Sequence, residues 1–188
     1  REFRQAVERF GRGRIELLPL PGLEDIPPCE ETGATFEENA AQKALYYSRH
    51  APGMVFTDDS GLEAAALNGE PGVRSARFAG EGAGDKANNR LLLERLVGKD
   101  DRRARFVCAV ALAEGGRLHG RFRGEVEGWI VDAERGGNGF GYDPLFFYAP
   151  FGCTFGEASP ERKLEVSHRA RALEQMVRWL LPAEAAGA

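Results

Sequence analysis

Two adjacent carboxylates that follow a short apolar run are the residues best placed for chemistry. The run Met54–Phe56 is apolar, and Asp58, Asp59, Ser60 and Gly61 come after it. It predicts a buried strand that ends at the carboxylates. Because strand side chains alternate, Asp58 and Asp59 should face opposite sides, one toward a cleft and one toward backbone N–H groups of a turn. Ligands of α/β proteins bind at such strand ends, although an ordinary Asp-rich turn is the alternative.

A second acidic segment precedes an expected helix. Thr35 and Glu38 have the spacing of a capping box, which predicts a helix from there to about Arg49. Glu38 is therefore assigned mainly to capping, whereas Glu30 and Glu31 lie on a loop and can point away from the helix. With a strand-end carboxylate they would form a hard, oxygen-only site that suits Mg²⁺ shared with substrate phosphates. Soft metals are disfavoured because the sequence has no Cys/His cluster.

A basic group lies near the carboxyl end of the chain. Ser167 can cap a helix, which puts His168 and Arg169 in its first turn. A cation there opposes the helix dipole, so its placement makes sense if an anion or a carbonyl-rich ligand also binds. The alternative is a solvated charged face. Lys163 and Lys43 are further candidate cations, and Lys43 could equally be an exposed lysine.

The turn Phe140-Gly141-Tyr142-Asp143 carries aromatic rings next to glycine. A ring on such a loop can stack on a nucleotide base, which is worth roughly 1–3 kcal/mol. Asp143 could accept a hydrogen bond from a base N–H. The alternative is a turn whose rings fill the core. Because Leu145–Phe147 already supplies core side chains, base binding is the favoured interpretation.

The order of the expected elements predicts an α/β fold with an elongated mixed sheet flanked by helices. Helices are expected near 3–10, 35–49, 85–97 and 167–181, with Asp85 as a cap of the third. Strands are expected near 15–18, 54–57, 104–113 and 117–132, with a hairpin turn at 114–116.

Composition limits the function classes. A chain of 188 residues predicts one domain, here a bilobed domain over 1–182 with a frayed tail at 183–188. The net charge of −4 argues against a general nucleic-acid or membrane surface. The three scattered cysteines indicate a reduced, cytoplasmic protein. Neither an apolar run of about 20 residues nor a leader is evident.

Five motifs in order carry a resemblance to a known family. They are Glu31–Ala44, Asp58–Leu62, Gly69–Arg77, Gly139–Pro144, and Lys163 with Ser167–Arg169. In this order they resemble the inosine triphosphate pyrophosphatase family, which acts on noncanonical purine nucleoside triphosphates. Each motif alone is weak, but the resemblance covers nearly the whole chain.

The resemblance implies an α/β fold with two lobes and a central cleft, usually as a homodimer. It implies hydrolysis of ITP, dITP and XTP to the monophosphate and pyrophosphate. It also implies that Asp59 accepts a proton and that Glu31 and Asp59 hold Mg²⁺. The implied substrate contacts are Lys43, Ser60, Phe140, Gly141, Tyr142, Asp143, Lys163, His168 and Arg169.

Members of that family begin with a strand and a Ser/Thr-x-Asn-x-x-Lys loop that grips the phosphates. This sequence begins at Arg1, in what looks like the helix after that loop. We therefore expect the strand and the loop to precede Arg1 in the natural protein.

Base choice follows from the implied contacts. Hypoxanthine and xanthine present N1–H and a 6-oxo group, which an acceptor such as Asp143 and a donor such as Arg169 would match, whereas adenine would leave both unpaired. Guanine shares both groups and is not excluded. Two other functions stay open: a non-catalytic nucleotide-binding module, and a phosphatase or septum-inhibitor-type pyrophosphatase acting on other modified nucleotides.

Overall fold

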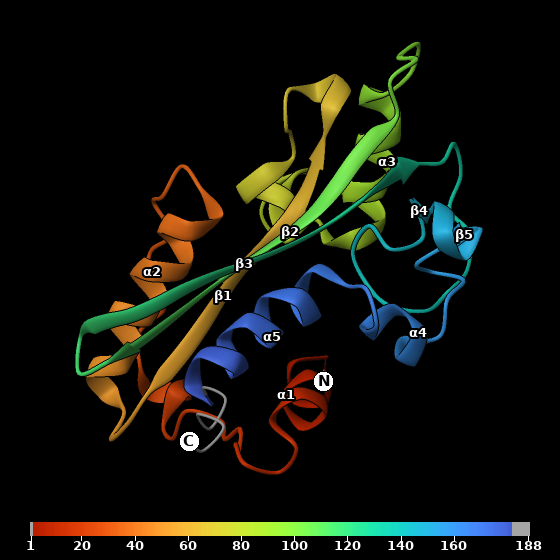
Figure 1. The fold of residues 1–188 in the computed structure, drawn as a ribbon. Coiled ribbons are helices and arrows are strands. Elements are labelled where there is room, and N and C mark those ends of the chain that lie inside the picture. The colour runs from red at the N-terminus through yellow and green to blue at the C-terminus, as the bar shows by residue number, and fades with distance from the viewer. Residues whose placement is uncertain (1, 182–188) are drawn as a thin grey trace. The chain divides into compact units, whose positions relative to one another are not determined.

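The structure is a computed structural model that describes residues 2–181. The tail expected at 183–188 lies outside them. Within the described residues, five strands form one sheet in the order β1-β2-β3-β4-β5. The strands are β1 (Val55–Ala64), β2 (Arg103–Glu114), β3 (Arg117–Ile130), β4 (Phe146–Tyr148) and β5 (Cys153–Thr154). The α-helices are α1 (Glu2–Gly11), α2 (Phe36–Tyr47), α3 (Gly84–Arg95), α4 (Pro160–Leu164) and α5 (His168–Leu180) (Figure 1). Short 3₁₀ helices occupy Leu23–Asp25, Ser48–His50, Ala65–Leu67, Gly72–Arg77 and Ala149–Phe151.

The α/β class and the flanking helices are confirmed, but the sheet is antiparallel and not mixed as predicted. Its strands are neighbours in the same order as in the chain, as in a meander, which joins antiparallel pairs. The predicted hairpin is present, because β2 ends at Glu114 and β3 begins at Arg117. None of the described helices is both long and apolar enough to cross a bilayer.

The chain divides into two compact units, each described by itself. Among the described residues, unit 1 comprises 2–59, 108–124 and 168–181, and unit 2 comprises 60–107 and 125–167. Each unit therefore contains part of β1, β2 and β3. A single bilobed domain over 1–182 stays a prediction.

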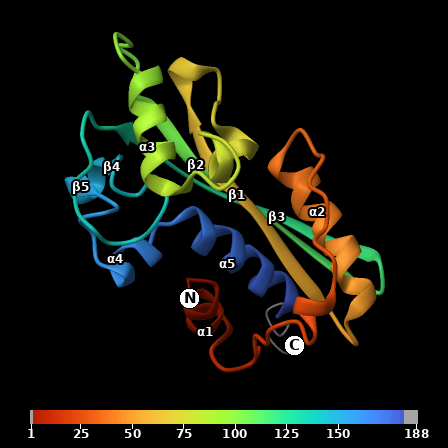
Figure 2. The same ribbon diagram turned by 180° about the vertical axis from the view of Figure 1, so that it is seen from behind.

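In unit 1, α1 and α5 lie side by side in both ribbon views (Figures 1 and 2). The apolar faces of both helices are buried, with Val7 in α1 and Leu173 and Val177 in α5 each at most 2% exposed. The start of α5 packs against β3 at Gly124, where a Cβ would lie 2.1 Å from the carbonyl oxygen of His168. A glycine at this position therefore lets the first turn of α5 approach the strand closely.

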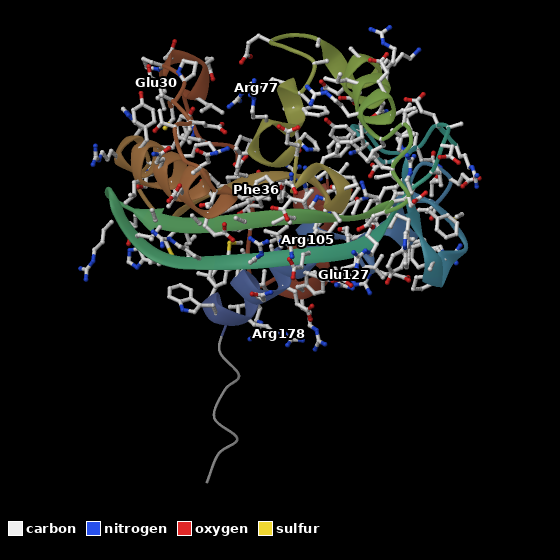
Figure 3. All side chains as sticks on the ribbon, turned by 90° about the horizontal axis from the view of Figure 1, so that it is seen from above. Glu30, Phe36, Arg77, Arg105, Glu127 and Arg178 are labelled. Atoms are coloured by element: carbon white, nitrogen blue, oxygen red, sulfur yellow. The ribbon has the colours of Figure 1, made fainter. Side chains whose placement is uncertain are left out.

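The capping box predicted for α2 is confirmed. The Thr35 hydroxyl accepts a hydrogen bond from the Glu38 backbone N–H, and the Glu38 carboxylate accepts one from the Thr35 backbone N–H. Phe36, the first residue of α2, is 3% exposed. Glu30 lies on the outer rim of the same unit (Figure 3). The cap therefore fixes where the acidic loop meets the helix.

In unit 2, a cluster of aromatic and aliphatic side chains forms the core around Phe106, Phe146 and Phe155. The sheet also carries charged side chains. Arg105 of β2 donates to Glu63 of β1 at 2.6 Å, and Glu127 extends from the neighbouring strand β3 (Figure 3).

Three local predictions are wrong. Ile15–Leu18 forms no strand; it lines an apolar cavity of about 600 Å³ in unit 1, just before Pro19 and Pro21. β1 does not end at the carboxylates but continues to Ala64, so no turn follows them. Asp85 does not cap α3, because it lies inside the first turn and its carboxylate accepts the Gly141 backbone N–H at 2.7 Å.

Candidate functional site

In unit 1, the carboxylates of Glu31 and Asp59, which come from separate segments, both lie next to the ammonium group of Lys43. We call these residues the acidic cluster. The Lys43 Nζ lies 3.0 Å from Glu31 Oε1 and 3.7 Å from Asp59 Oδ1. Strand alternation places Asp59, which is 9% exposed, on the buried side of β1. The acidic loop before α2 and the middle of β1 are thus brought together beside Lys43, whereas the metal-binding role implied for Glu31 and Asp59 stays a prediction.

Helix α2 supplies the other two polar residues of this cluster. Asn39 and Lys43 are four residues apart, so they lie on one face of the helix. The Asn39 amide donates to Asp59 Oδ2 at 3.0 Å, and its Oδ1 accepts the Gly33 backbone N–H at 2.8 Å. Sequence reasoning missed Asn39. Its i,i+4 spacing from a candidate cation on a helix already assigned was the available signal.

The environment of Asp59 acts on its carboxyl in opposing ways. Burial raises the pKa of Asp59, and the charges of Glu31 and Asp58 raise it further. The hydrogen bond from Asn39 and the charge of Lys43 lower it, but burial is the largest effect and the net pKa is above the ordinary value. A raised pKa brings a carboxylate closer to the range in which it can accept a proton from water.

The donor set is compatible with a hard cation. Among residues 2–181 no group of three or more His, Cys, Asp and Glu side chains could hold a metal by itself. Glu31 and Asp59 each place a carboxylate oxygen near the positively charged Lys43 Nζ. Magnesium is usually bound by one or two carboxylates together with substrate phosphates, so these two residues could hold it.

In the aromatic turn of unit 2, the Phe140 ring is exposed and the Tyr142 ring is buried. The Phe140 side chain is 52% exposed. Tyr142 is buried, and its hydroxyl donates to the Ser75 carbonyl oxygen at 2.9 Å. Phe140 is therefore the ring that can stack on a ligand, whereas Tyr142 fills the core.

A buried ion pair lies behind the turn. The Lys163 Nζ donates to Asp143 Oδ2 at 2.6 Å, and the two side chains are 4% and 2% exposed. The same carboxylate oxygen accepts the Phe140 backbone N–H at 2.9 Å. A Cβ at Gly139 would lie 2.0 Å from this oxygen, so glycine is required next to it. Asp143 and Lys163 thus hold the backbone from which the Phe140 ring extends.

Side chains of helix α3 also hold the aromatic turn through hydrogen bonds, a contact that the sequence did not predict. Asp85 accepts the Gly141 N–H, and the Asn89 amide donates to the Gly141 carbonyl oxygen at 3.1 Å. Both polar groups of this glycine are therefore fixed, and the positive φ of 60° at Gly141 suits a residue without a side chain.

The basic pair is part of unit 1. His168 is 1% exposed and begins α5, directly after the buried Ser167. The Arg169 guanidinium lies 3.2 Å from His168 Nε2 and 3.4 Å from Glu2 Oε2. The cap expected of Ser167 stays a prediction.

Ser60, another of the predicted site residues, follows Asp59 in β1 and is partly exposed.

The fold is antiparallel α/β, and its carboxylate pair beside one lysine offers oxygen ligands of the kind that a hard cation prefers. The chain belongs to the Ham1 family, whose model matches residues 1–179. This confirms the family that the motifs predicted.

Sequence relatives and solved structures agree with that assignment. A dITP/XTP pyrophosphatase of Syntrophobacter fumaroxidans is 48% identical and covers 96% of this chain, which spans 79% of that relative. A dITP/XTP pyrophosphatase of Acidobacterium capsulatum is 46% identical, with coverage of 94% and 90%. The structure of the Staphylococcus aureus Ham1 protein has a TM-score of 0.87 at 38% identity, with coverage of 96% and 94%.

Proposed function

We propose that this chain hydrolyses noncanonical purine nucleoside triphosphates (ITP, dITP and XTP) to the monophosphate and pyrophosphate, and so removes them from the nucleotide pool. The proposal is supported by relatives 43–49% identical that are named dITP/XTP pyrophosphatases. The observation that carries it is that carboxylate oxygens of Glu31 and Asp59 lie 3.0 Å and 3.7 Å from the same Lys43 Nζ.

In this proposal Glu31 and Asp59 hold Mg²⁺ together with the substrate phosphates. The chemistry that Mg²⁺ supplies when bound is withdrawal of negative charge from the phosphate oxygens. A monophosphate and pyrophosphate form when the bridge between the α- and β-phosphorus is broken, and we propose that water attacks the α-phosphorus with pyrophosphate as the leaving group. Asp59 accepts the proton of that water, and general base catalysis of this kind typically contributes about 10²–10⁴-fold in rate.

The remaining residues bind the substrate. Phe140 offers a ring for stacking on the base, on a backbone fixed by Asp143 and Lys163. The other substrate contacts, proposed from the family resemblance, are Lys43, Ser60, Gly141, Tyr142, Asp143, Lys163, His168 and Arg169. We also propose that the protein acts as a homodimer in the cytoplasm, where the thiols of Cys29, Cys108 and Cys153 would stay reduced.

A product assay tests the proposed function. The protein is incubated with Mg²⁺ and with ITP, XTP or ATP, and the products are identified by ³¹P NMR. We expect inosine and xanthosine monophosphates with pyrophosphate, and a much lower kcat/KM for ATP. Release of orthophosphate would indicate a phosphatase, and binding of ITP without turnover would indicate a nucleotide-binding module. Equal kcat/KM values for ATP and ITP would contradict the proposed base choice.

Replacement of Glu31 by glutamine should raise the Mg²⁺ concentration required for half-maximal turnover of ITP. Loss of one carboxylate should weaken apparent Mg²⁺ affinity by at least about tenfold, since even residues behind a metal ligand typically contribute 10–100-fold. The matched control is Glu30→Gln, which makes the same change on the exposed neighbouring residue. An equal Mg²⁺ requirement in the two variants would remove Glu31 from the metal site.

Replacement of Phe140 by alanine should raise KM for ITP and leave the fold intact, because half of this side chain is exposed. Loss of a stacked ring worth about 1–3 kcal/mol corresponds to a rise of roughly 5–150-fold. Phe140→Trp keeps an aromatic face and should keep KM near the wild-type value. If both variants have the wild-type KM, the ring does not contact the base.

A further inference from the structure

We propose that Asn39 is a positioning residue that joins the loop bearing Glu31 to the Asp59 carboxylate. Its side chain contacts both segments of the acidic cluster, at 2.8 Å from the Gly33 nitrogen and 3.0 Å from Asp59 Oδ2. Its catalytic consequence rests on the proposed function, but the bridge itself does not.

The position of Asn39 leaves it little freedom. It is 1% exposed, and its backbone N–H donates to the Thr35 carbonyl oxygen in the first turn of α2. A short, buried side chain on a capped helix has a fixed direction. Lys43, the other α2 residue in the cluster, has a long flexible side chain with 16% exposure. Asn39 is therefore the more rigid of the two connections to Asp59.

The loop approaches Asn39 so closely that only glycine fits. A Cβ at Gly33 would lie 2.6 Å from the Glu38 Cβ and 2.7 Å from Asn39 Oδ1. Gly33 is two residues after Glu31, so the contact fixes the loop next to the carboxylate. The close approach is an observation independent of the hydrogen bonds, and it indicates the same contact between loop and helix.

Hydrogen-bond chemistry determines which way the amide faces. A backbone N–H can only donate, so it requires the oxygen of Asn39, and the amide nitrogen then faces Asp59. Asp59 Oδ2 thus accepts a hydrogen bond from the Asn39 amide, and Asp59 Oδ1 is the oxygen that lies near Lys43. The charged groups that act on this carboxylate are Lys43, Glu31 and Asp58. Asn39 adds an uncharged donor that fixes the orientation of the carboxylate.

The test uses Asn39→Ala and Asn39→Leu, the second of which keeps most of the side-chain volume if the first does not fold. Amide hydrogen exchange of Gly33, read by NMR, should become at least about tenfold faster in both variants, because its acceptor is lost. Turnover of ITP should fall about 10–100-fold in kcat, as for residues that orient metal ligands. KM should change much less, since both hydrogen-bond partners of the Asn39 side chain are groups of the protein itself.

The matched control is Asn88→Ala in α3. Asn88 is also buried and also bridges two segments, accepting the Ala79 N–H at 2.8 Å and donating to the Ala76 carbonyl oxygen at 3.1 Å. This variant should lose stability but keep both the exchange of Gly33 and the kcat. Unchanged Gly33 exchange in the Asn39 variants would overturn the bridge. Faster exchange with a kcat equal to that of Asn88→Ala would show a purely structural role and also overturn the proposal. If the wild-type protein releases no pyrophosphate, the proposed function fails, and Gly33 exchange still tests the bridge.

Discussion

Replacement of Asp59 by asparagine is expected to lower kcat for ITP by about 10²–10⁴-fold in a protein that stays folded. The side chain keeps its shape but can no longer accept a proton. Its carbonyl oxygen can still receive the hydrogen bond from Asn39, which lies 3.0 Å away. Steady-state kinetics at saturating ITP and Mg²⁺, together with thermal unfolding of the same samples, measure the two quantities.

The matched control for this variant is Glu63→Gln. Glu63 lies four residues later in β1 and receives its hydrogen bond from Arg105 of unit 2. The change from carboxylate to amide is the same, but Glu63 is outside the acidic cluster, so kcat should stay within a few-fold of wild type. Near-normal turnover of Asp59→Asn would show that Asp59 is not the base.

The second large effect concerns stability. Lys163→Met should lower the free energy of unfolding by about 3–5 kcal/mol, because it leaves the Asp143 carboxylate buried without its cation. Methionine retains much of the side-chain stem, so lost packing is a minor part. The pair is almost inaccessible to water, with side chains 4% and 2% exposed. Urea unfolding followed by circular dichroism measures the loss.

Two further variants isolate the charge. The double variant Asp143→Asn with Lys163→Met removes both charges and should recover a large part of the loss. Arg178→Met breaks an ion pair of the same 2.6 Å length to Glu174, but Arg178 is 77% exposed, so its cost should be about 1 kcal/mol or less. If Lys163→Met costs no more than Arg178→Met, burial of the pair does not have the expected effect.

Local sequence signals predicted those parts of the fold that depend on neighbours in the chain. The start of α2 followed from Thr35 and Glu38, because both partners of the capping box are three residues apart. The turn between β2 and β3 followed from two glycines. The continuation of β1 through its polar residues was missed, because Asp, Ser and Gly favour turns by propensity and the pairing of strands overrides that preference.

For the candidate site, the sequence indicated the residue types but not the contacts between residues that are far apart in the chain. Residue chemistry left the choice between Glu30 and Glu31 and between Asp58 and Asp59 open, and the family resemblance implied Glu31 and Asp59. The structure places these two beside one lysine. The sequence could not show that Asp143 and Lys163, 20 residues apart, pair with each other. It also gave no role to Asn39 and assigned Asp85 to a helix cap, because the side-chain contacts that these residues make in the structure are with residues 20 and 56 positions away in the chain.

The most direct test of the account asks whether Glu31 and Asp59 share one divalent ion. Mn²⁺, which is paramagnetic and accepts the same oxygen ligands as Mg²⁺, can be titrated into the protein with a non-hydrolysable ITP analogue and followed by electron paramagnetic resonance. We predict a site in the wild type and in Glu63→Gln that is weakened at least about tenfold in both Glu31→Gln and Asp59→Asn. Unchanged Mn²⁺ affinity in either of the last two variants would contradict the account.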